Sequence, residues 1–199
     1  MIFAFNTNVI TVTIYLLLGQ CGLLTEHALA TEDIPSPFML AISILFCMIV
    51  EDFGFYCSHR TLHHPKLYGQ IHKVHHTYNQ TVSIAAEYCH PIEFVLANLL
   101  PTGLGPLILG PKMHIFTVLV WYMVRVGETL DGHSGYEFSW TPYRLVPFSG
   151  GAEYHGYHHN KNVGNYSSFF SVWDTVFGTN KSYYEEIEAR DQQLAGKKA

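Results

Sequence analysis

The sequence concentrates its histidines in three compact clusters. His59 and His63 are four residues apart, and the other clusters are His72-x2-His75-His76 and His155-x2-His158-His159. On a helix, residues i, i+3 and i+4 share one face, so each cluster predicts imidazoles that point at one place. Neutral imidazole binds zinc, iron, copper and nickel. The spacing therefore predicts a metal site.

The number of candidate ligands indicates two metal ions. A tetrahedral zinc ion needs about four ligands, and these clusters offer eight. A lone histidine is more often a surface or core residue, but chance does not readily supply three clusters with the same spacing. A structural zinc site without turnover is the alternative. We expect His64 to lie outside the coordination sphere, because His63 already faces His59.

The composition is that of a membrane protein. Hydrophobic residues make up 48% of the chain and charged residues only 14%, whereas about 25% of residues are charged in soluble domains. A net charge of -5 argues against nucleic-acid binding.

Three apolar segments are candidates for the membrane: residues 9–24, residues 38–56 and a hairpin over residues 92–126. Pro101 and Pro106, with the glycines between them, interrupt the first half of the hairpin, so we expect neither half to cross the bilayer alone. Basic residues follow residue 56, and an acidic loop precedes residue 38. The positive-inside rule therefore places the histidines in the cytosol.

These segments predict an all-α fold, an integral membrane helical bundle with a cytosolic histidine-rich helical cap that holds a di-metal site. We expect one domain over residues 1–180 and a polar C-terminal tail over residues 181–199, which forms a solvated helix face.

The clusters resemble those of the fatty acid hydroxylase and sterol desaturase superfamily of membrane di-iron enzymes. Residues 86–93 (Ala-Glu-Tyr-Cys-His-Pro-Ile-Glu) are similar to the C-4 methylsterol monooxygenase branch, as are residues 127–138, 164–168 and 173–179. Members usually have a longer N-terminal region with additional membrane helices. The chain is therefore expected to be a truncated isoform or a compact relative.

The resemblance implies O2-dependent oxidation of the C-4 methyl group of 4-methylsterols by two iron ions, in sterol biosynthesis at the endoplasmic reticulum membrane. The sterol substrate would arrive from the bilayer lipid, and electrons would come from NAD(P)H through cytochrome b5 or a similar carrier with its reductase. The chain has no G-x-G-x-x-G motif, consistent with an outside reductase. Sterol side-chain hydroxylation, C-5 desaturation and fatty acyl hydroxylation are the alternatives on the same scaffold.

Five further residues are expected near the metals. The resemblance of residues 127–138 to the family assigns His133 as the ninth ligand. Glu137 stands where related hydroxylases have a second histidine. Glu137 is either a ligand or an exposed loop acid, because glycines around it disfavour a helix. Asp131 and Glu128 are candidate acceptors for ligand N–H groups. His90, before Pro91, either starts a helix or faces the metals or substrate, and we favour the second role.

Overall fold

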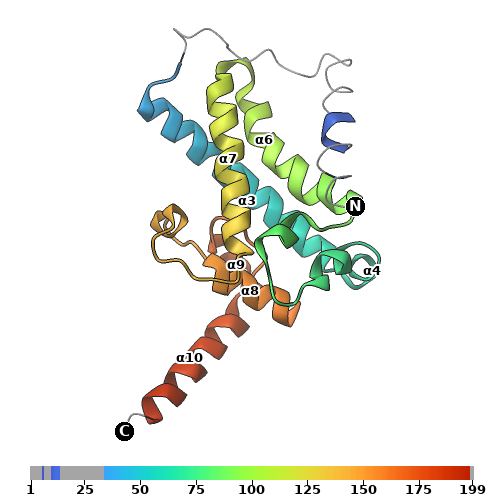
Figure 1. The fold of residues 1–199 in the computed structure, drawn as a ribbon, viewed down its shortest axis with the longest axis vertical. Coiled ribbons are helices and arrows are strands. Elements are labelled where there is room, and N and C mark those ends of the chain that lie inside the picture. The colour runs from blue at the N-terminus through green and yellow to red at the C-terminus, as the bar shows by residue number, and fades with distance from the viewer. Residues whose placement is uncertain (1–5, 7–9, 14–33, 198–199) are drawn as a thin grey trace.

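The computed structural model describes residue 6, residues 10–13 and residues 34–197, and these residues form helices and no strand. Long helices make up an apolar layer, and shorter helices form a cap at one end of it (Figure 1). The first predicted membrane segment, residues 9–24, lies outside the described residues except for residues 10–13. The elements in chain order are α3 (Pro37–Leu62), α4 (Pro65–Tyr68), η3 (His72–Thr77), η4 (Ser83–Glu87), α5 (Pro91–Glu93), η5 (Phe94–Leu99), α6 (Leu100–Leu109), η6 (Gly110–Lys112), α7 (Ile115–Gly132), η7 (Pro142–Leu145), α8 (Gly151–Lys161), α9 (Val172–Phe177) and α10 (Lys181–Gly196).

Helix α3 covers the membrane segment expected over residues 38–56. It begins after Ser36, whose hydroxyl accepts a hydrogen bond from the Met39 N–H, and it is long and apolar enough to cross a membrane. Only 22% of its apolar window is buried inside the protein. Side chains such as Phe38 and Ile42 are exposed. A core helix of a soluble protein would bury this surface, so α3 indicates contact with lipid.

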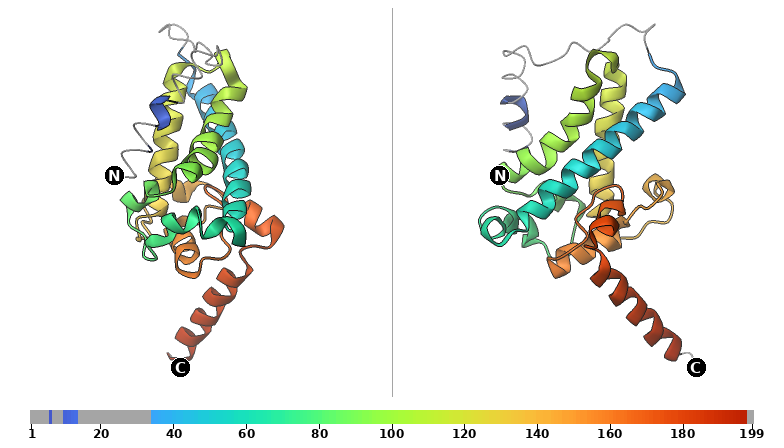
Figure 2. Two further views of the ribbon diagram at one scale, coloured as in Figure 1. Left: turned by 90° about the vertical axis from the view of Figure 1, so that its right-hand side faces the viewer. Right: turned by 180° about the vertical axis from the view of Figure 1, so that it is seen from behind.

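Residues 92–126 form a helical hairpin as predicted, but its first half is not interrupted. Residues 91–109 run as one helix through α5, the π-helical η5 and α6, and they are also long and apolar enough to cross a membrane. After the η6 turn, α7 returns beside α6 in all three ribbon views (Figures 1 and 2). Pro101 is the second residue of α6, close to the point where hydrogen bonding changes from π to α and a missing N–H is most easily accommodated.

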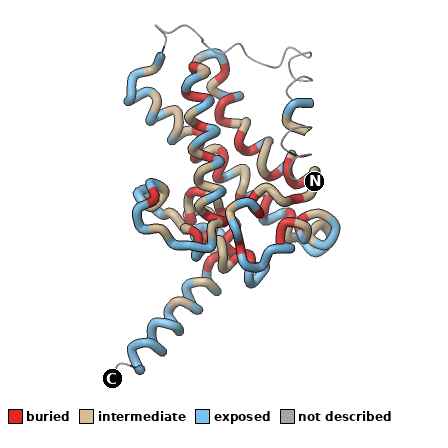
Figure 3. The backbone as a smooth tube through the Cα atoms, in the orientation of Figure 1, coloured by how far each residue is buried: buried red, intermediate tan, exposed pale blue. Residues whose placement is uncertain are grey.

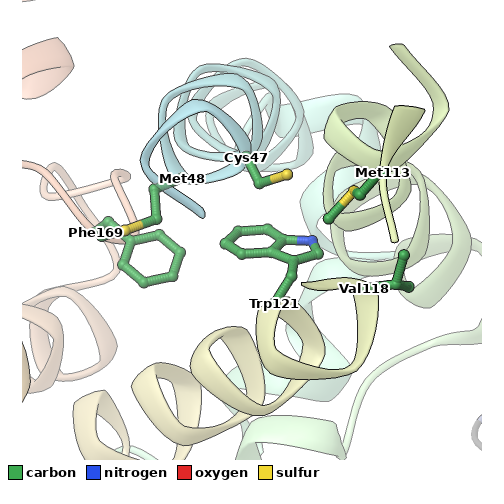
Figure 4. Close-up of a cluster of buried hydrophobic side chains, with 6 residues drawn as sticks. All are labelled: Cys47, Met48, Met113, Val118, Trp121 and Phe169. Carbon is green, nitrogen blue, oxygen red and sulfur yellow. The ribbon is translucent and has the colours of Figure 1, made fainter. Parts of the chain in front are cut away.

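Small residues let α3 and α6 pack closely. A Cβ atom at Gly105 would lie 2.8 Å from Sγ of Cys47, so only glycine fits there without a shift. The core lies between these helices and α7. Its centre is Trp121, which packs among Cys47, Met48 and Phe169 (Figure 4). The Trp121 indole N–H donates to the Thr102 carbonyl oxygen at 2.9 Å, so its one polar group is satisfied.

A buried polar network joins the apolar layer to the cap. The guanidinium of Arg125 on α7 donates to Glu51 on α3 and to Glu128, at 3.0 Å from the latter. Glu128 also accepts from the Ser168 hydroxyl at 3.1 Å. Asp52 accepts from the backbone N–H of Ser168 at 3.1 Å. The segment that follows α8 is thereby fixed against both long helices.

The polar tail forms α10, an exposed helix that projects away from the cap (Figures 1 and 3). Ion pairs connect it to α8. Arg190 pairs with Glu153, and Glu186 pairs with Lys161 at 2.8 Å. The expected solvated helix face is therefore confirmed. Exposed pairs of this kind contribute little stability, so α10 is only loosely held.

Candidate metal centre

The cap brings all nine histidines that were predicted as ligands into two groups. Within each group, one ligand atom from every residue lies within 4.8 Å of the others. Metal–nitrogen bonds of about 2.0–2.1 Å place opposite ligands about 4.2 Å apart, so each group could close on one ion with small shifts. Group one contains His59, His63, His72, His76 and His158, and group two contains His75, His133, His155 and His159.

The grouping corrects the expectation that each H-x2-H-H cluster points at one place. In α8, His155 and His159 belong to group two, whereas His158 belongs to group one. On an α-helix, positions i and i+4 are close in angle, but i+3 and i+4 are about 100° apart. The η3 cluster splits in the same way, since His75 joins group two whereas His72 and His76 belong to group one.

Splitting the clusters places the two groups side by side. The rings of His76 in group one and His159 in group two have centroids 4.6 Å apart. His75 and His76 are neighbours in the chain and lie in different groups. Both α8 and η3 thus contribute to both groups, and the two groups adjoin.

Hydrogen bonds from Nδ1 orient several rings. His72 Nδ1 donates to a carboxylate oxygen of Glu93 at 2.8 Å, and His59 Nδ1 donates to the Tyr166 carbonyl oxygen at 2.8 Å. A proton on Nδ1 leaves the Nε2 lone pair free for a metal. His59 Nε2 is buried and has no hydrogen-bond partner among the described residues. A bound metal would satisfy this nitrogen.

A turn with left-handed backbone conformation after α8 supplies two carbonyl oxygens that accept hydrogen bonds from histidines of group one. The Gly164 carbonyl oxygen accepts from His158 Nδ1 at 2.6 Å, and Tyr166 accepts from His59. Gly164 has φ +69°, and a Cβ there would lie 2.2 Å from a backbone oxygen. Asp174 accepts the backbone N–H of Tyr166 at 2.9 Å and so holds the turn. The glycine is therefore required by the ligand geometry.

Burial keeps the imidazoles neutral. It lowers the pKa of His63 to about 2, that of His76 to about 3 and that of His133 to about 4, with the neighbouring imidazoles adding to the effect for each. The neutral form is the one that binds metals, and it prevails throughout the physiological pH range.

The two histidines placed outside the ligand set by sequence, His64 and His90, cap helices. The ring Nδ1 of His64 accepts from the Lys66 N–H at 3.3 Å, and that of His90 accepts from the Ile92 N–H at 3.2 Å. Both lie outside the two groups. His64 was expected there. For His90, the structure shows the helix start, and the favoured role toward the metals or substrate stays a prediction.

The three predicted acidic residues also lie outside the groups. Helix α7 ends at Gly132, so His133 and Glu137 share no helical face. Glu137 pairs with Arg144, which also donates to Asp131 at 3.1 Å. Glu128 is engaged by Arg125. The carboxylate that does orient a ligand is Glu93, which local spacing could not reveal because it is 21 residues from His72.

Comparison with known proteins agrees with this geometry. The family model for fatty acid hydroxylases matches residues 44–179. A putative methylsterol monooxygenase of Dictyostelium discoideum is 42% identical over 85% of this chain and 62% of its own length. Methylsterol monooxygenase 1 of Gallus gallus is 39% identical over 84% of this chain and 56% of its own length. A very-long-chain aldehyde decarbonylase of Oryza sativa subsp. indica is 43% identical over 77% of this chain and 58% of its own length.

The chain spans about three fifths of the length of these relatives. No solved structure matches it. The family model covers the long helices, both histidine groups and the left-handed turn after α8. The chain therefore belongs to the fatty acid hydroxylase family.

Proposed function

We propose that the chain oxidises the C-4 methyl group of 4-methylsterols with O2, using two iron ions held by the two histidine groups. The observation that carries the proposal is the pair of adjoining all-histidine groups at one end of helices suited to a membrane. Relatives named methylsterol monooxygenases give the substrate class.

The donor set fits iron. Imidazole is a suitable ligand for iron and for zinc, and five rings in one group with four in the other exceed the needs of a single structural zinc. When bound, the irons supply the oxidising power that breaks an unactivated C–H bond, which acid–base side chains cannot do. The residues of the cap hold and orient the metals.

The chain's own residues contribute ligation, orientation and exclusion of water. Glu93 and the carbonyl oxygens of Tyr166 and Gly164 fix ring tautomers. His158 and His159 are fully buried, so bulk water does not reach these ligands. The apolar surface of α3 leads toward His59 near its C-terminal end, and a sterol in the bilayer could approach along it.

The surroundings of the reaction are part of the proposal. We place the protein in the endoplasmic reticulum membrane as a multi-pass protein with the metal centre on the cytosolic side. Basic residues after the apolar part of α3 support this orientation. Electrons would come from NAD(P)H through cytochrome b5 or a similar carrier, since the chain has no nucleotide-binding glycine motif.

A second candidate follows from the rice relative named a very-long-chain aldehyde decarbonylase. Purified full chain in lipid nanodiscs should be analysed for bound metal and then supplied with O2, a reductase system, and either a 4-methylsterol or a long-chain aldehyde. We expect two irons per chain and O2-dependent loss of the sterol C-4 methyl group.

Consumption of the aldehyde alone would replace the proposal with the second candidate. Bound zinc without turnover would favour a structural site. His90→Ala serves as a control because His90 caps a helix outside both groups, and it should keep both irons. In cells, deletion of the gene should cause 4-methylsterols to accumulate.

A further inference from the structure

The connection between α7 and α8 exposes large apolar side chains. We call residues 134–150 the aromatic loop. Within it, Tyr136 is 69% exposed, Trp140 77%, Leu145 84% and Phe148 70%. Clustered apolar exposure of this kind marks a binding surface rather than ordinary surface variation.

The loop has no unpaired charge. Its only charged residues are Glu137 and Arg144, and they form an ion pair with each other. Arg144 also donates to Asp131 at 3.1 Å and to Ser149 at 3.0 Å. Two guanidinium nitrogens thus donate hydrogen bonds, and the third, Nε, lies in the ion pair with Glu137. Neutralising these groups internally lowers the cost of moving the loop out of water.

The loop lies next to the apolar surface of the long helices. In Figures 1 and 2 it projects sideways from the cap, whereas α10 runs from the cap away from the long helices. The Phe148 carbonyl oxygen accepts from the backbone N–H of Ser171 at the start of α9. Trp173 on α9 packs against Phe53 on α3 with ring centroids 4.7 Å apart.

Exposed apolar surface continues along this path. Phe53 is 46% exposed, and Val176 and Phe177 at the end of α9 are 65% and 51% exposed. The aromatic loop thus extends the lipid-facing surface of α3 sideways over the base of the cap.

We propose that the aromatic loop is an interfacial anchor, which inserts Trp140, Leu145 and Phe148 into the surface of the bilayer that α3 enters. Tryptophan and tyrosine favour the membrane interface because they combine an apolar ring with a polar group. The internal pairing of Glu137 with Arg144 suits contact with lipid more than with a charged protein partner.

The anchor would also position the metal centre. The loop begins directly after His133 and ends directly before α8, which carries His155, His158 and His159. Both ends of the loop are thus joined to candidate ligands. Its insertion would hold group two at the membrane surface, whatever lipid the centre oxidises.

The test uses the fluorescence of Trp140 in the full chain, reconstituted at one copy per nanodisc. The chain has three tryptophans, so the difference between the wild type and Trp140→Phe isolates the Trp140 signal. We expect lipids brominated near the headgroup to quench Trp140 more than lipids brominated at the chain ends. Aqueous iodide should quench it weakly.

Leu145→Glu should reduce lipid quenching of Trp140 severalfold. Val163→Glu is the matched control, because Val163 is 50% exposed and follows α8 in the sequence, whereas the aromatic loop precedes α8. It should leave quenching unchanged. Full access of iodide with no lipid quenching would overturn the proposal and leave the surface to a second copy or another protein. Lipid quenching only in anionic bilayers would also overturn it, because it would indicate electrostatic rather than apolar attachment.

Discussion

Glu93 offers a test of how the metal centre is held. Its carboxylate accepts from His72 Nδ1 at 2.8 Å, and both side chains are almost fully buried. Glu93→Gln keeps the size and an acceptor oxygen but removes the negative charge. Glu93→Leu removes the acceptor as well. Both variants leave every histidine of the two groups in place.

The expected magnitude follows from the type of hydrogen bond. A neutral hydrogen bond contributes about 1 kcal/mol and one to a charged group about 1.5–3 kcal/mol. The loss of about 1 kcal/mol in Glu93→Gln corresponds to roughly fivefold weaker metal binding. Loss of an orienting partner typically weakens metal binding about 10–100-fold, which we expect for Glu93→Leu.

Metal affinity should be measured by competition with a chelator on the full chain in nanodiscs, together with thermal unfolding of the metal-free protein. One carboxylate oxygen of Glu93 is buried without a hydrogen-bond partner among the described residues, so the metal-free protein should lose little stability in Glu93→Gln. Weaker metal binding with unchanged metal-free stability is the expected signature. Unchanged affinity in both variants would show that Glu93 does not orient a ligand.

Three further predictions concern acid, the ninth ligand and helix packing. Burial lowers the pKa of His63 to about 2 and that of His133 to about 4, so below about pH 6.5 the unfolded chain binds protons that the folded chain does not. The free energy of unfolding of the metal-free protein should therefore fall by about 1.4 kcal/mol per pH unit for each such histidine. A flat unfolding midpoint between pH 7 and 5 would contradict this. His133→Ala should lose the metal of group two while Glu137→Ala keeps both metals, as elemental analysis would show; equal metal loss in the two variants would refute the grouping. Gly105→Ala should lower the unfolding temperature by several degrees because its new Cβ meets the backbone of α3, whereas Gly103→Ala, which meets nothing within 4 Å, should not; equal midpoints would argue against close packing there.

The histidine spacing predicted which residues could gather, but it could not predict how they divide. The η3 and α8 clusters split in the same way, with the i and i+4 rings together and the i+3 ring apart, although η3 is a 3-10 helix and α8 is an α-helix. The split in α8 depends on what lies on either side of it. Similarly, apolar length predicted α3 and the hairpin. The continuity of residues 91–109 through Pro101 depends on a local π-helical stretch.

The acidic residues show why the orienting contacts were harder to predict than the ligands. Glu51 and Asp52 stand near the end of an apolar segment, where a sequence suggests the edge of a membrane helix, yet both are fully buried. Glu51 is paired with Arg125, 74 residues away, and Asp52 accepts the backbone N–H of Ser168, 116 residues away. Local spacing carries information about neighbours on one helix, whereas these partners meet only when the long helices have packed. A ligand set can therefore be predicted from a single sequence in this fold, but the groups that orient the ligands require the tertiary structure.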